Sequence, residues 1–355
     1  MSGTPDEKNI KRIIFATELG YMPYRVAGAQ NAMHELNLEL MARGIEPVIL
    51  CGAIPGQPDD KVMREEYGGY TVYHAKQPHI VAELVVQQFR PDAAVVQGGA
   101  MTALSHAFHR AGVPTVVNFL DCEFKDGNLF APGSPFLFVG NAPFVARRAE
   151  VMLGIECHMV QSIIRPDDFV TDTVRSHALF IGSSPLKGIE IAFRIAESRP
   201  DIPFLFVESW PIGDDIRNIY MSRAAAAGNI EWSRPVADML PFYAKARLPL
   251  VPSIWNDSAP RVVAESQASG IPVLATDIAG LPYMVGPGGR LVDVDAPHAD
   301  WLEAFDAMWN DEQEYAQLSE LARQHAHRAE VAPGRLAERF LALVTKYVTD
   351  ERQGA

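Results

Sequence analysis

Residues Pro252–Pro272 read PSIWNDSAPRVVAESQASGIP, and this stretch decides how the fold is interpreted. Two acidic residues stand eight positions apart in it, Asp257 before Pro260 and Glu265 after it. The pattern predicts a loop that follows a strand, and then a helix that begins near Pro260 and ends before Gly270. Because a helix rises about 1.5 Å per residue, both carboxylates can reach one crevice at its N-terminus. Such crevices, at the carboxyl ends of parallel strands, are where α/β proteins bind nucleotides.

Composition places the chain among ordinary globular proteins. It has 355 residues, of which 48% are hydrophobic and 21% are charged, and this length is sufficient for two domains. The formal net charge of −13 disfavours nonspecific binding to nucleic acid, because the phosphates repel an acidic surface. It also disfavours broad adhesion to an anionic membrane, although a local basic patch would still permit peripheral contact. We therefore expect no nucleic-acid partner.

Cysteine usage and hydropathy indicate a cytoplasmic location. Cys51, Cys122 and Cys157 show no spacing typical of a metal site or a redox motif, and they are expected to be reduced thiols. The N-terminus is polar and leads into a strand pattern, so we expect no signal peptide. No apolar run in the sequence approaches the roughly 18–20 residues that are needed to cross a bilayer.

Strand and helix patterns alternate along the whole chain. Short apolar runs typical of strands recur at 12–16, 47–51, 70–74, 92–97, 115–119 and 136–139, and again at 178–181, 203–207, 229–232, 248–251, 273–275 and 290–292. Helical periodicity fills most of the intervals, for example 236–245. The alternation predicts an α/β fold with mostly parallel sheets that are covered on both faces. The polar stretch 164–177 lies between the two series and predicts a linker between two domains.

The stretch Pro252–Pro272 resembles the signature of retaining glycosyltransferases of family 4, which have the GT-B fold. The shared pattern is an acid, seven residues and a glutamate, followed by a small-residue helix end and Gly-x-Pro. Here Asp257 and Glu265 are the acids, and Gly270–Pro272 is the ending. The opening Pro252–Trp255 is similar to one branch of the family. Acids at this spacing are common on solvated helices, so it is the whole segment that indicates the family.

The resemblance implies two Rossmann-like domains that face each other across a cleft. An acceptor-side domain is expected over residues 1–165, and a domain that binds the nucleotide sugar over residues 175–334. A C-terminal helix at about 335–355 is implied to pack back on the first domain. Clefts between domains are favoured ligand sites.

The residues after the strand pattern 178–181 are candidates to bind the donor's diphosphate. A leaving diphosphate needs cations, backbone N–H groups or a helix N-terminus to stabilise its charge. Lys187 and Gly188 open the next helix pattern, and they match a Lys-Gly pair that the family places on the diphosphate. Where the family has an arginine in this turn, the chain has Ser183 or Ser184. This departure bears on activity more than on fold.

The signature itself supplies further donor contacts, as the resemblance implies them. Glu265 would accept two hydrogen bonds from the ribose hydroxyls, which suits a carboxylate held on a helix. Asp257 would lie at the donor sugar. The family usually has glutamate there, and aspartate is shorter by one methylene group. Backbone groups of Ser258, Ala259 and Pro260 would contact the sugar or the phosphates.

Two arginines and two tryptophans are further candidates on the donor side. Arg261 and Arg234 are the cations that would replace the missing arginine, although the position of each is more typical of a surface arginine. The base is expected to lie against the backbone near residues 230–232, which include Trp232. Trp210 follows another strand pattern, where the family commonly has a glycine-rich turn, and it is more typical of a packed tryptophan.

The N-terminal half carries the candidates for the acceptor side. Gly28 stands in the family's glycine-rich loop between the first strand and the first helix, where it would let the backbone approach the diphosphate or the acceptor. After the strand 115–119 the family often has His-Asp. Here the histidine is replaced by leucine and Asp121 remains, with Asn118 or Glu123 as substitutes for part of the histidine's role. The segment 121–135 is expected to line the acceptor side.

These residues together predict a glycosyltransferase that moves a sugar from a nucleotide-diphosphate-sugar donor to an acceptor hydroxyl. Retention of the anomeric configuration is implied by the resemblance, with Lys187, Asp257 and Asp121 nearest the reaction. The leaving phosphate would help to take the acceptor proton, while Lys187 and helix dipoles hold the developing charge. We expect no metal ion and no cofactor, because the nucleotide sugar is a co-substrate and a lysine is the cation. The donor base, donor sugar, acceptor and oligomeric state stay open.

Three alternatives remain open. A nucleotide-sugar epimerase of the same fold would be expected to show a histidine pair and a different acid pattern. A non-catalytic protein that binds sugar nucleotides or serves as a scaffold is favoured by the missing arginine and histidine, and disfavoured by the presence of Asp257, Glu265 and Lys187. A transferase with an unusual donor would explain the replaced phosphate-side residues as adaptations.

Overall fold

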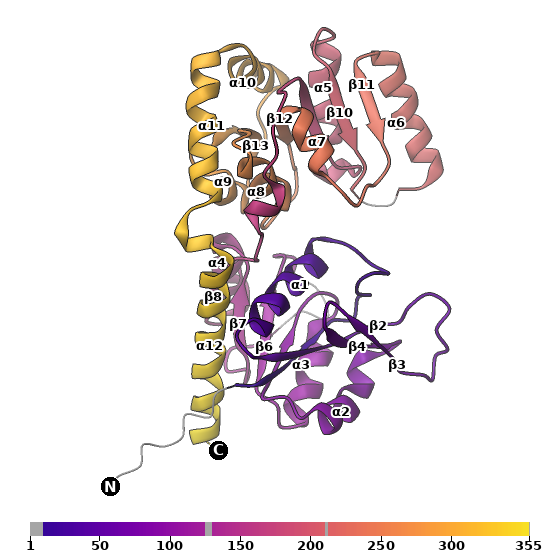
Figure 1. Ribbon diagram of the computed structural model, residues 1–355, viewed down its shortest axis with the longest axis vertical. Helices are drawn as coiled ribbons and strands as arrows, with labels where there is room; N and C mark the ends of the chain where they lie inside the picture. Colours follow the sequence, from indigo (N-terminus) through magenta and orange to yellow (C-terminus); the bar gives the residue numbers. More distant parts are fainter. Residues whose placement is uncertain (1–9, 125–129, 210–211, 355) are drawn as a thin grey trace. The chain divides into compact units, whose positions relative to one another are not determined.

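The computed structural model describes residues 10–124, 130–209 and 212–354 of the chain. The chain divides into two compact units. Unit 1 is Met1–Ile163 with Ala332–Ala355, and unit 2 is Ile164–Val331. The chain therefore leaves unit 1 once and returns to it for its last helix (Figure 1).

Unit 1 is built on an eight-stranded sheet with the order β3-β4-β2-β1-β5-β6-β7-β8. Its strands are β1 (Arg12–Ala16), β2 (Glu46–Gly52), β3 (Met63–Tyr67), β4 (Tyr70–Ala75), β5 (Ala93–Val96), β6 (Thr115–Phe119), β7 (Leu137–Gly140) and β8 (His158–Met159). Neighbouring strands pair in parallel, except that β3 is antiparallel to β4. The strand order reverses between β1 and β5, so the topological switch point of this sheet lies between them.

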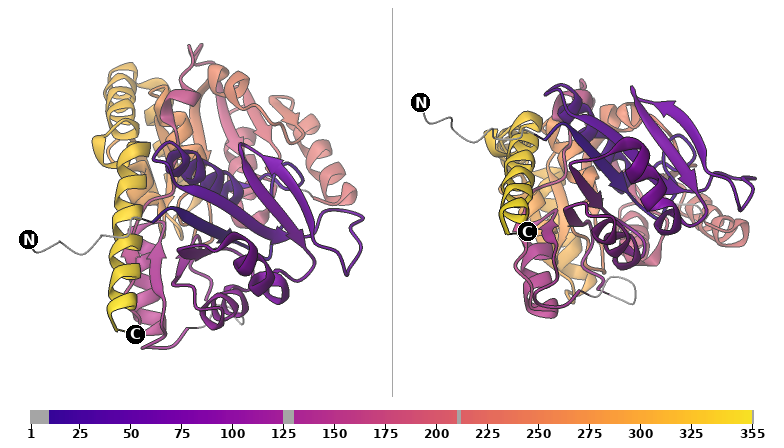
Figure 2. Two further views of the ribbon diagram at one scale, coloured as in Figure 1. Left: turned by 60° about the horizontal axis from the view of Figure 1, so that its bottom comes forward. Right: turned by 90° about the horizontal axis from the view of Figure 1, so that it is seen from below.

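Helices cover both faces of this sheet. They are α1 (Gly28–Met41), α2 (Pro78–Phe89), α3 (Met101–Arg110), α4 (Pro143–Leu153) and α12 (Pro333–Gly354). Ile13 and Phe15 of β1 pack in one core with α1 and α12, whereas Ile14 and Ala16 pack in the other with α2, α3 and α4. A strand buried on both faces reads as a continuous apolar run. Figure 2 shows α12 beside the sheet, and its Phe340 stacks on Phe15 with ring centroids 6.4 Å apart.

Unit 2 contains a six-stranded parallel sheet with the order β11-β10-β9-β12-β13-β14. Its strands are β9 (His177–Ile181), β10 (Phe204–Val207), β11 (Ile230–Ser233), β12 (Ala246–Val251), β13 (Val273–Asp277) and β14 (Gly289–Asp293). Its helices are α5 (Ile189–Ser198), α6 (Asp214–Ala227), α7 (Leu240–Lys245), α8 (Arg261–Ala268), α9 (Leu281–Val285), α10 (His298–Asn310) and α11 (Glu312–Ala326). α5, α6 and α10 share one core, while α7, α8 and α9 contribute to cores on the other face. The predicted α/β fold with two mostly parallel sheets is confirmed.

The elements α7 and β3 illustrate how the structure differs from the sequence-based expectation. The helix expected over 236–245 begins at Leu240, because the Asp238 carboxylate accepts a hydrogen bond from the Leu240 N–H at 2.9 Å and Pro241 stands in the first turn. The antiparallel strand β3 was not predicted, because its sequence MREEY is mostly exposed at the edge of the sheet and lacks an apolar pattern.

Candidate functional site

The candidate site of unit 2 lies at the carboxyl ends of β9 and β12. These strands are neighbours, and the strand order reverses between them, so a crevice is expected beyond their ends. Two loops leave the strands at this point. Residues 182–188 lead through the short 3-10 helix η2 (Pro185–Lys187) to α5, and residues 252–260 lead to α8.

The two loops touch each other. The Ile254 N–H donates a hydrogen bond to the Leu186 carbonyl at 3.0 Å. Gly188 has a φ of +75°, and a Cβ atom added to it would lie 1.8 Å from the carbonyl oxygen of Pro252. Glycine is therefore needed at position 188 for two reasons, the left-handed backbone and the close approach of the second loop.

Lys187 and Asp257 form an ion pair between these loops. The distance from Nζ of Lys187 to Oδ2 of Asp257 is 2.5 Å, and only 18% and 11% of the two side chains are exposed. The Ser253 hydroxyl donates to the same carboxylate oxygen at 3.1 Å. The structure thus brings the predicted phosphate-binding lysine into direct contact with the first acid of the signature.

Glu265, the second acid, is buried and held by two donors. The Tyr243 hydroxyl donates to its Oε2 at 2.6 Å, and Nε of Arg261 donates to its Oε1 at 3.0 Å. Tyr243 is fully buried. Burial, together with the nearby Glu265 carboxylate, raises the pKa of Tyr243 well above its ordinary value, so the phenol stays a donor. The interpretation of Arg261 as a surface arginine is wrong, since only 16% of its side chain is exposed.

The backbone before α8 is held in place by the loop after β13. The Gly280 N–H donates to the Asp257 carbonyl at 3.0 Å. A Cβ atom on Gly280 would lie 1.6 Å from the carbonyl oxygen of Ser258. Ser258 is buried and Ala259 is half-buried, while Pro260 is the N-cap residue of α8. The backbone of residues 258–260, which is predicted to contact the donor's sugar or phosphates, is therefore held in place by packing.

The two serines after β9 serve the local structure of the turn. Ser183 is buried, and the Ser184 hydroxyl accepts a hydrogen bond from the Leu186 N–H at 3.2 Å at the start of η2. A serine hydroxyl carries no positive charge. Within residues 182–188, Lys187 is accordingly the one side chain that can supply a cation.

Beyond β10 and β11, a buried cluster occupies the position where the family commonly has a glycine-rich turn. Glu208 is fully buried and accepts hydrogen bonds from Nε of Arg217 at 2.8 Å and from Nε1 of Trp232 at 2.9 Å. The Trp232 ring lies within ring-contact distance of Phe193, with centroids 6.4 Å apart. The Trp232 indole is thus engaged by protein partners. Trp210 lies outside the described residues.

The candidates of the N-terminal half lie at the carboxyl ends of the unit 1 strands. Gly28 is the first residue of α1, and Ala27 is the N-cap. The Asp121 carboxylate accepts a hydrogen bond from the Glu123 N–H at 3.0 Å in the loop after β6. Part of the segment 121–135, namely 125–129, lies outside the described residues. The roles of Gly28 and Asp121 stay predictions.

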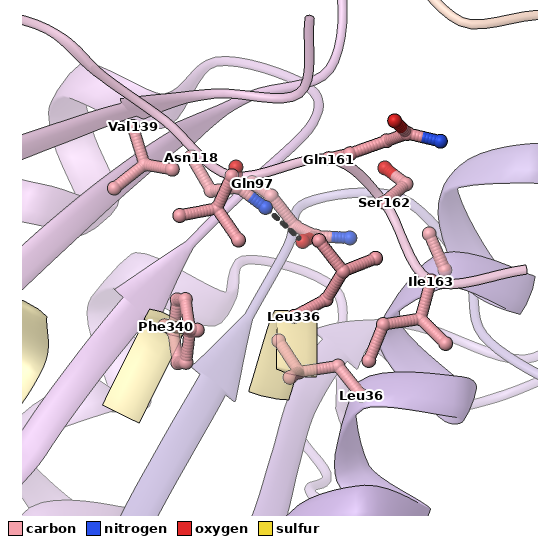
Figure 3. A pocket seen from close by; sticks show the side chains of 11 residues that line it. Leu36, Gln97, Asn118, Val139, Gln161, Ser162, Ile163, Leu336 and Phe340 are labelled. Atoms are coloured by element: carbon pink, nitrogen blue, oxygen red, sulfur yellow. Dashed lines mark hydrogen bonds between the residues drawn. The ribbon is translucent and has the colours of Figure 1, made fainter. Parts of the chain in front are cut away.

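A small cavity of unit 1 lies next to Asn118 (Figure 3). The Asn118 amide donates to the Gln97 side-chain oxygen at 3.0 Å, and the Gln97 amide donates to the Ala29 carbonyl at 3.0 Å. Gln161 and Ser162 add polar groups to the lining. The cavity measures about 20 Å³, which is room for about one water molecule. It is therefore too small to hold a sugar.

Sequence reasoning found the charged residues of unit 2 but missed their supports. Tyr243 was not singled out, although it stands in an aromatic pattern just before β12. The turn after β10 was noted at Trp210 as a departure from the family, but the pairing of Glu208 with Arg217 carried no sequence signal. Pairings between residues distant along the chain are properties of the tertiary structure, which explains these omissions.

Within residues 10–124, 130–209 and 212–354, no three His, Cys, Asp or Glu side chains are grouped so that they would hold a metal ion. Among the helices of those ranges, none combines the length and the hydropathy that are needed to cross a bilayer.

Comparisons with known proteins show which sequences and folds this chain is similar to. Residues 175–311 match the family model described as "Glycosyl transferases group 1". The D-inositol 3-phosphate glycosyltransferase of Corynebacterium glutamicum is 39% identical over 95 residues, which are 26% of this chain and 22% of that protein. The enzyme of the same name from Paenarthrobacter aurescens is 28% identical over 174 residues, 46% of this chain and 41% of that protein. The chain thus matches less than half the length of these curated relatives.

Solved structures match nearly the whole chain in fold. Sucrose-phosphate synthase from Thermosynechococcus elongatus has a TM-score of 0.77 at 13% identity, covering 96% of this chain and 100% of that one. A glycosyltransferase from Rickettsia africae has a TM-score of 0.75 at 13% identity, covering 96% and 99%. HepE of Anabaena, solved with UDP-glucose, has a TM-score of 0.71 at 14% identity, covering 97% and 100%. The predicted GT-B fold is confirmed, and residues 175–311 are similar to the group 1 glycosyltransferase family.

Proposed function

We propose that this chain transfers a sugar from a nucleoside-diphosphate-sugar donor to an acceptor hydroxyl, with retention of configuration and without a metal ion. The observation that carries the proposal is the Lys187–Asp257 contact at the switch point of the unit 2 sheet. A lysine and an acid held together at the carboxyl ends of β9 and β12 suit a ligand with an anionic and a sugar part. HepE, a relative in fold, was solved with UDP-glucose.

The donor is proposed to lie along this end of the sheet. Its diphosphate lies at Lys187 and at the N-termini of α5 and α8, where helix dipoles favour negative charge. Its sugar lies against Asp257, and its ribose lies at Glu265. A carboxylate offers about four acceptor positions, of which Tyr243 and Arg261 use two. Glu265 thus keeps the capacity to accept ribose hydroxyls.

The proposed reaction makes one bond and breaks one bond at the anomeric carbon. The bond between this carbon and the terminal phosphate oxygen breaks, and the leaving nucleoside diphosphate takes the bonding electrons. The acceptor oxygen bonds to the same face of the carbon, and its proton passes to the leaving phosphate. Lys187 stabilises the charge that develops on the diphosphate, a contribution of about 10²–10³ in rate for one such group.

The acceptor is proposed to bind on unit 1, with Asp121 and the loop at Gly28 as the predicted contacts. The curated relatives are named for D-inositol 3-phosphate. For this chain, the acceptor is proposed to be a hydroxyl compound.

A ligand screen tests the proposal. Thermal unfolding of the full chain is followed with UDP, GDP, ADP, dTDP and CMP and with their common sugars. A bound nucleotide at one hundred times its dissociation constant adds about 2.7 kcal/mol of stability. We expect a selective shift that disappears in Lys187→Ala. A flat response to all of these ligands would contradict the proposal.

The reaction itself is read from the product. The nucleotide sugar selected in the screen is incubated with candidate hydroxyl acceptors, and the anomeric configuration is assigned by NMR. Retention in the presence of a chelator is the expected result. An inverted product, or activity that requires an added divalent ion, would refute the corresponding part of the proposal.

A further inference from the structure

We propose that Arg261 supplies the second cation for the donor's diphosphate, in place of the arginine that family members have in the turn after β9. This inference rests on the proposed function, because it concerns the same donor site. It identifies the residue that compensates for the departure at Ser183 and Ser184.

The turn between β9 and α5 supplies a single cation. Ser183 is buried and Ser184 caps η2, so the turn is well packed with serines at both positions. Neither hydroxyl brings a positive charge. A diphosphate bound there would meet Lys187 as the one cation of residues 182–188. A second cation has to come from another element.

Arg261 lies at the start of the helix that follows the Asp257 loop. It is the first residue of α8, four positions after Asp257, the partner of Lys187. The intervening backbone is held by Gly280 through its contact with Ser258. The start of α8 therefore belongs to the same loop region that carries the Lys187–Asp257 pair, and the positive end of the helix dipole adds to the field there.

The guanidinium of Arg261 is held by Glu265. Only 16% of the Arg261 side chain is exposed, and its Nε donates to Glu265 at 3.0 Å. Glu265 is itself held by the buried Tyr243 at 2.6 Å. An arginine fixed in this way loses little freedom when it binds a ligand, and its planar fork matches a phosphate in two directions. A surface arginine would lack this support.

The charges of the two ion pairs balance only when Arg261 is present. The pairs Lys187–Asp257 and Arg261–Glu265 contribute two positive and two negative charges, which cancel. Without Arg261 the four positions would sum to one negative charge, and a diphosphate would be repelled. Arg261 thus lets the acid assigned to the ribose coexist with an anionic ligand.

The test measures UDP and uridine binding to the full chain by calorimetry and NMR titration. Arg261→Gln is compared with Arg234→Gln, which removes an exposed arginine beyond β11 and is the matched control. We expect Arg261→Gln to weaken UDP binding about tenfold or more beyond any loss for uridine, which has no phosphate. The weaker support of Glu265 affects the ribose of both ligands alike, so the difference between the two losses reports the contact with the diphosphate. Arg234→Gln should bind UDP as the wild type does.

Two results would overturn the inference. One is UDP affinity unchanged in Arg261→Gln. The other is an equal loss for UDP and uridine, which would show that Arg261 acts only by shaping the site. If Arg261→Gln alone does not fold, the comparison moves to Glu265→Gln with and without Arg261→Gln. No buried carboxylate is left unpaired there, and the added substitution should again weaken UDP about tenfold.

The failure of the proposed function looks different. In that case the wild type binds neither UDP nor any other nucleoside diphosphate of the screen, and both proposals fall. If the wild type binds and Lys187→Ala abolishes binding while Arg261→Gln does not weaken it, the donor site stands and only the role of Arg261 is rejected.

Discussion

The Nζ atom of Lys187 lies 2.5 Å from Oδ2 of Asp257, although the two residues stand 70 positions apart in the chain. The contact joins the loop after β9 to the loop after β12, at the point where the strand order of unit 2 reverses. It places the proposed phosphate-binding lysine in an ion pair with the first acid of the signature. Lys187–Asp257 and Arg261–Glu265 are thus two ion pairs of the candidate site.

Breaking this pair on one side should destabilise unit 2. Lys187→Met or Asp257→Asn leaves a mostly buried charge without its partner, and we expect each to lower the free energy of unfolding by about 1–3 kcal/mol, less than for a fully buried pair because part of each side chain meets solvent. The double variant should recover part of the loss. Denaturant unfolding of the four proteins measures the coupling, and strictly additive losses would contradict it.

Gly188→Ala should damage both stability and donor binding. The new Cβ would lie 1.8 Å from the Pro252 carbonyl oxygen at a φ of +75°, so the two loops must separate. We expect a loss of more than about 2 kcal/mol and no binding of the nucleotide selected in the screen.

The matched control for this change is Gly228→Ala. Gly228 has a φ of +78° and nothing within 4 Å of an added Cβ, so it tests the backbone conformation without the contact. Gly228→Ala should lower the free energy of unfolding by about 1 kcal/mol. Equal losses at positions 188 and 228 would show that the approach of the two loops is unimportant.

Tyr243→Phe should weaken the support of Glu265. The substitution removes a buried donor to a carboxylate, and we expect a loss of about 1–3 kcal/mol in the free energy of unfolding. Donor affinity should fall as well, because Glu265 then loses one of the two groups that hold it. A variant with unchanged stability and unchanged donor affinity would show that the Tyr243–Glu265 contact is dispensable.

The same residue makes a prediction about alkaline pH. The pKa of Tyr243 in the folded chain is raised above its ordinary value of 10.0 by burial and by Glu265. Its contribution to stability is therefore fully present below pH 10 and is lost as the pH rises toward the folded pKa. The gap in stability between wild type and Tyr243→Phe should narrow above pH 10. A constant or growing gap would contradict the assignment.

Ala279→Gly should stabilise the loop after β13. Ala279 has a φ of +54°, a left-handed conformation that costs an alanine about 1–2 kcal/mol relative to glycine. Against the extra flexibility of glycine, we expect a net gain of up to about 1 kcal/mol. Ala225→Gly, an exposed position inside α6, is the control, and it should lose about 1 kcal/mol. A loss at both positions would mean that Ala279 carries no strain.

The elements of the site were largely predictable from local sequence. The strand 12–16 matches β1, and the helix expected from Pro260 is α8, because apolar runs and a proline cap report on neighbours in the chain. The edge strand β3 was missed, since an exposed strand has no apolar pattern to detect. Arg261 was taken for a surface residue because burial of a long charged side chain depends on a partner, here Glu265 one helical turn away.

The sequence by itself determined the α/β fold, the position of the signature and the identity of its charged residues. The fold class follows from hydrophobic periodicity, and the charged residues of the signature are identified by their residue types. Only the tertiary structure decided which charges neutralise one another, that Tyr243 supports Glu265, and that Gly188 must accommodate Pro252. Such contacts depend on loops that meet at the end of a sheet after long intervals of chain, and no local pattern encodes their distances.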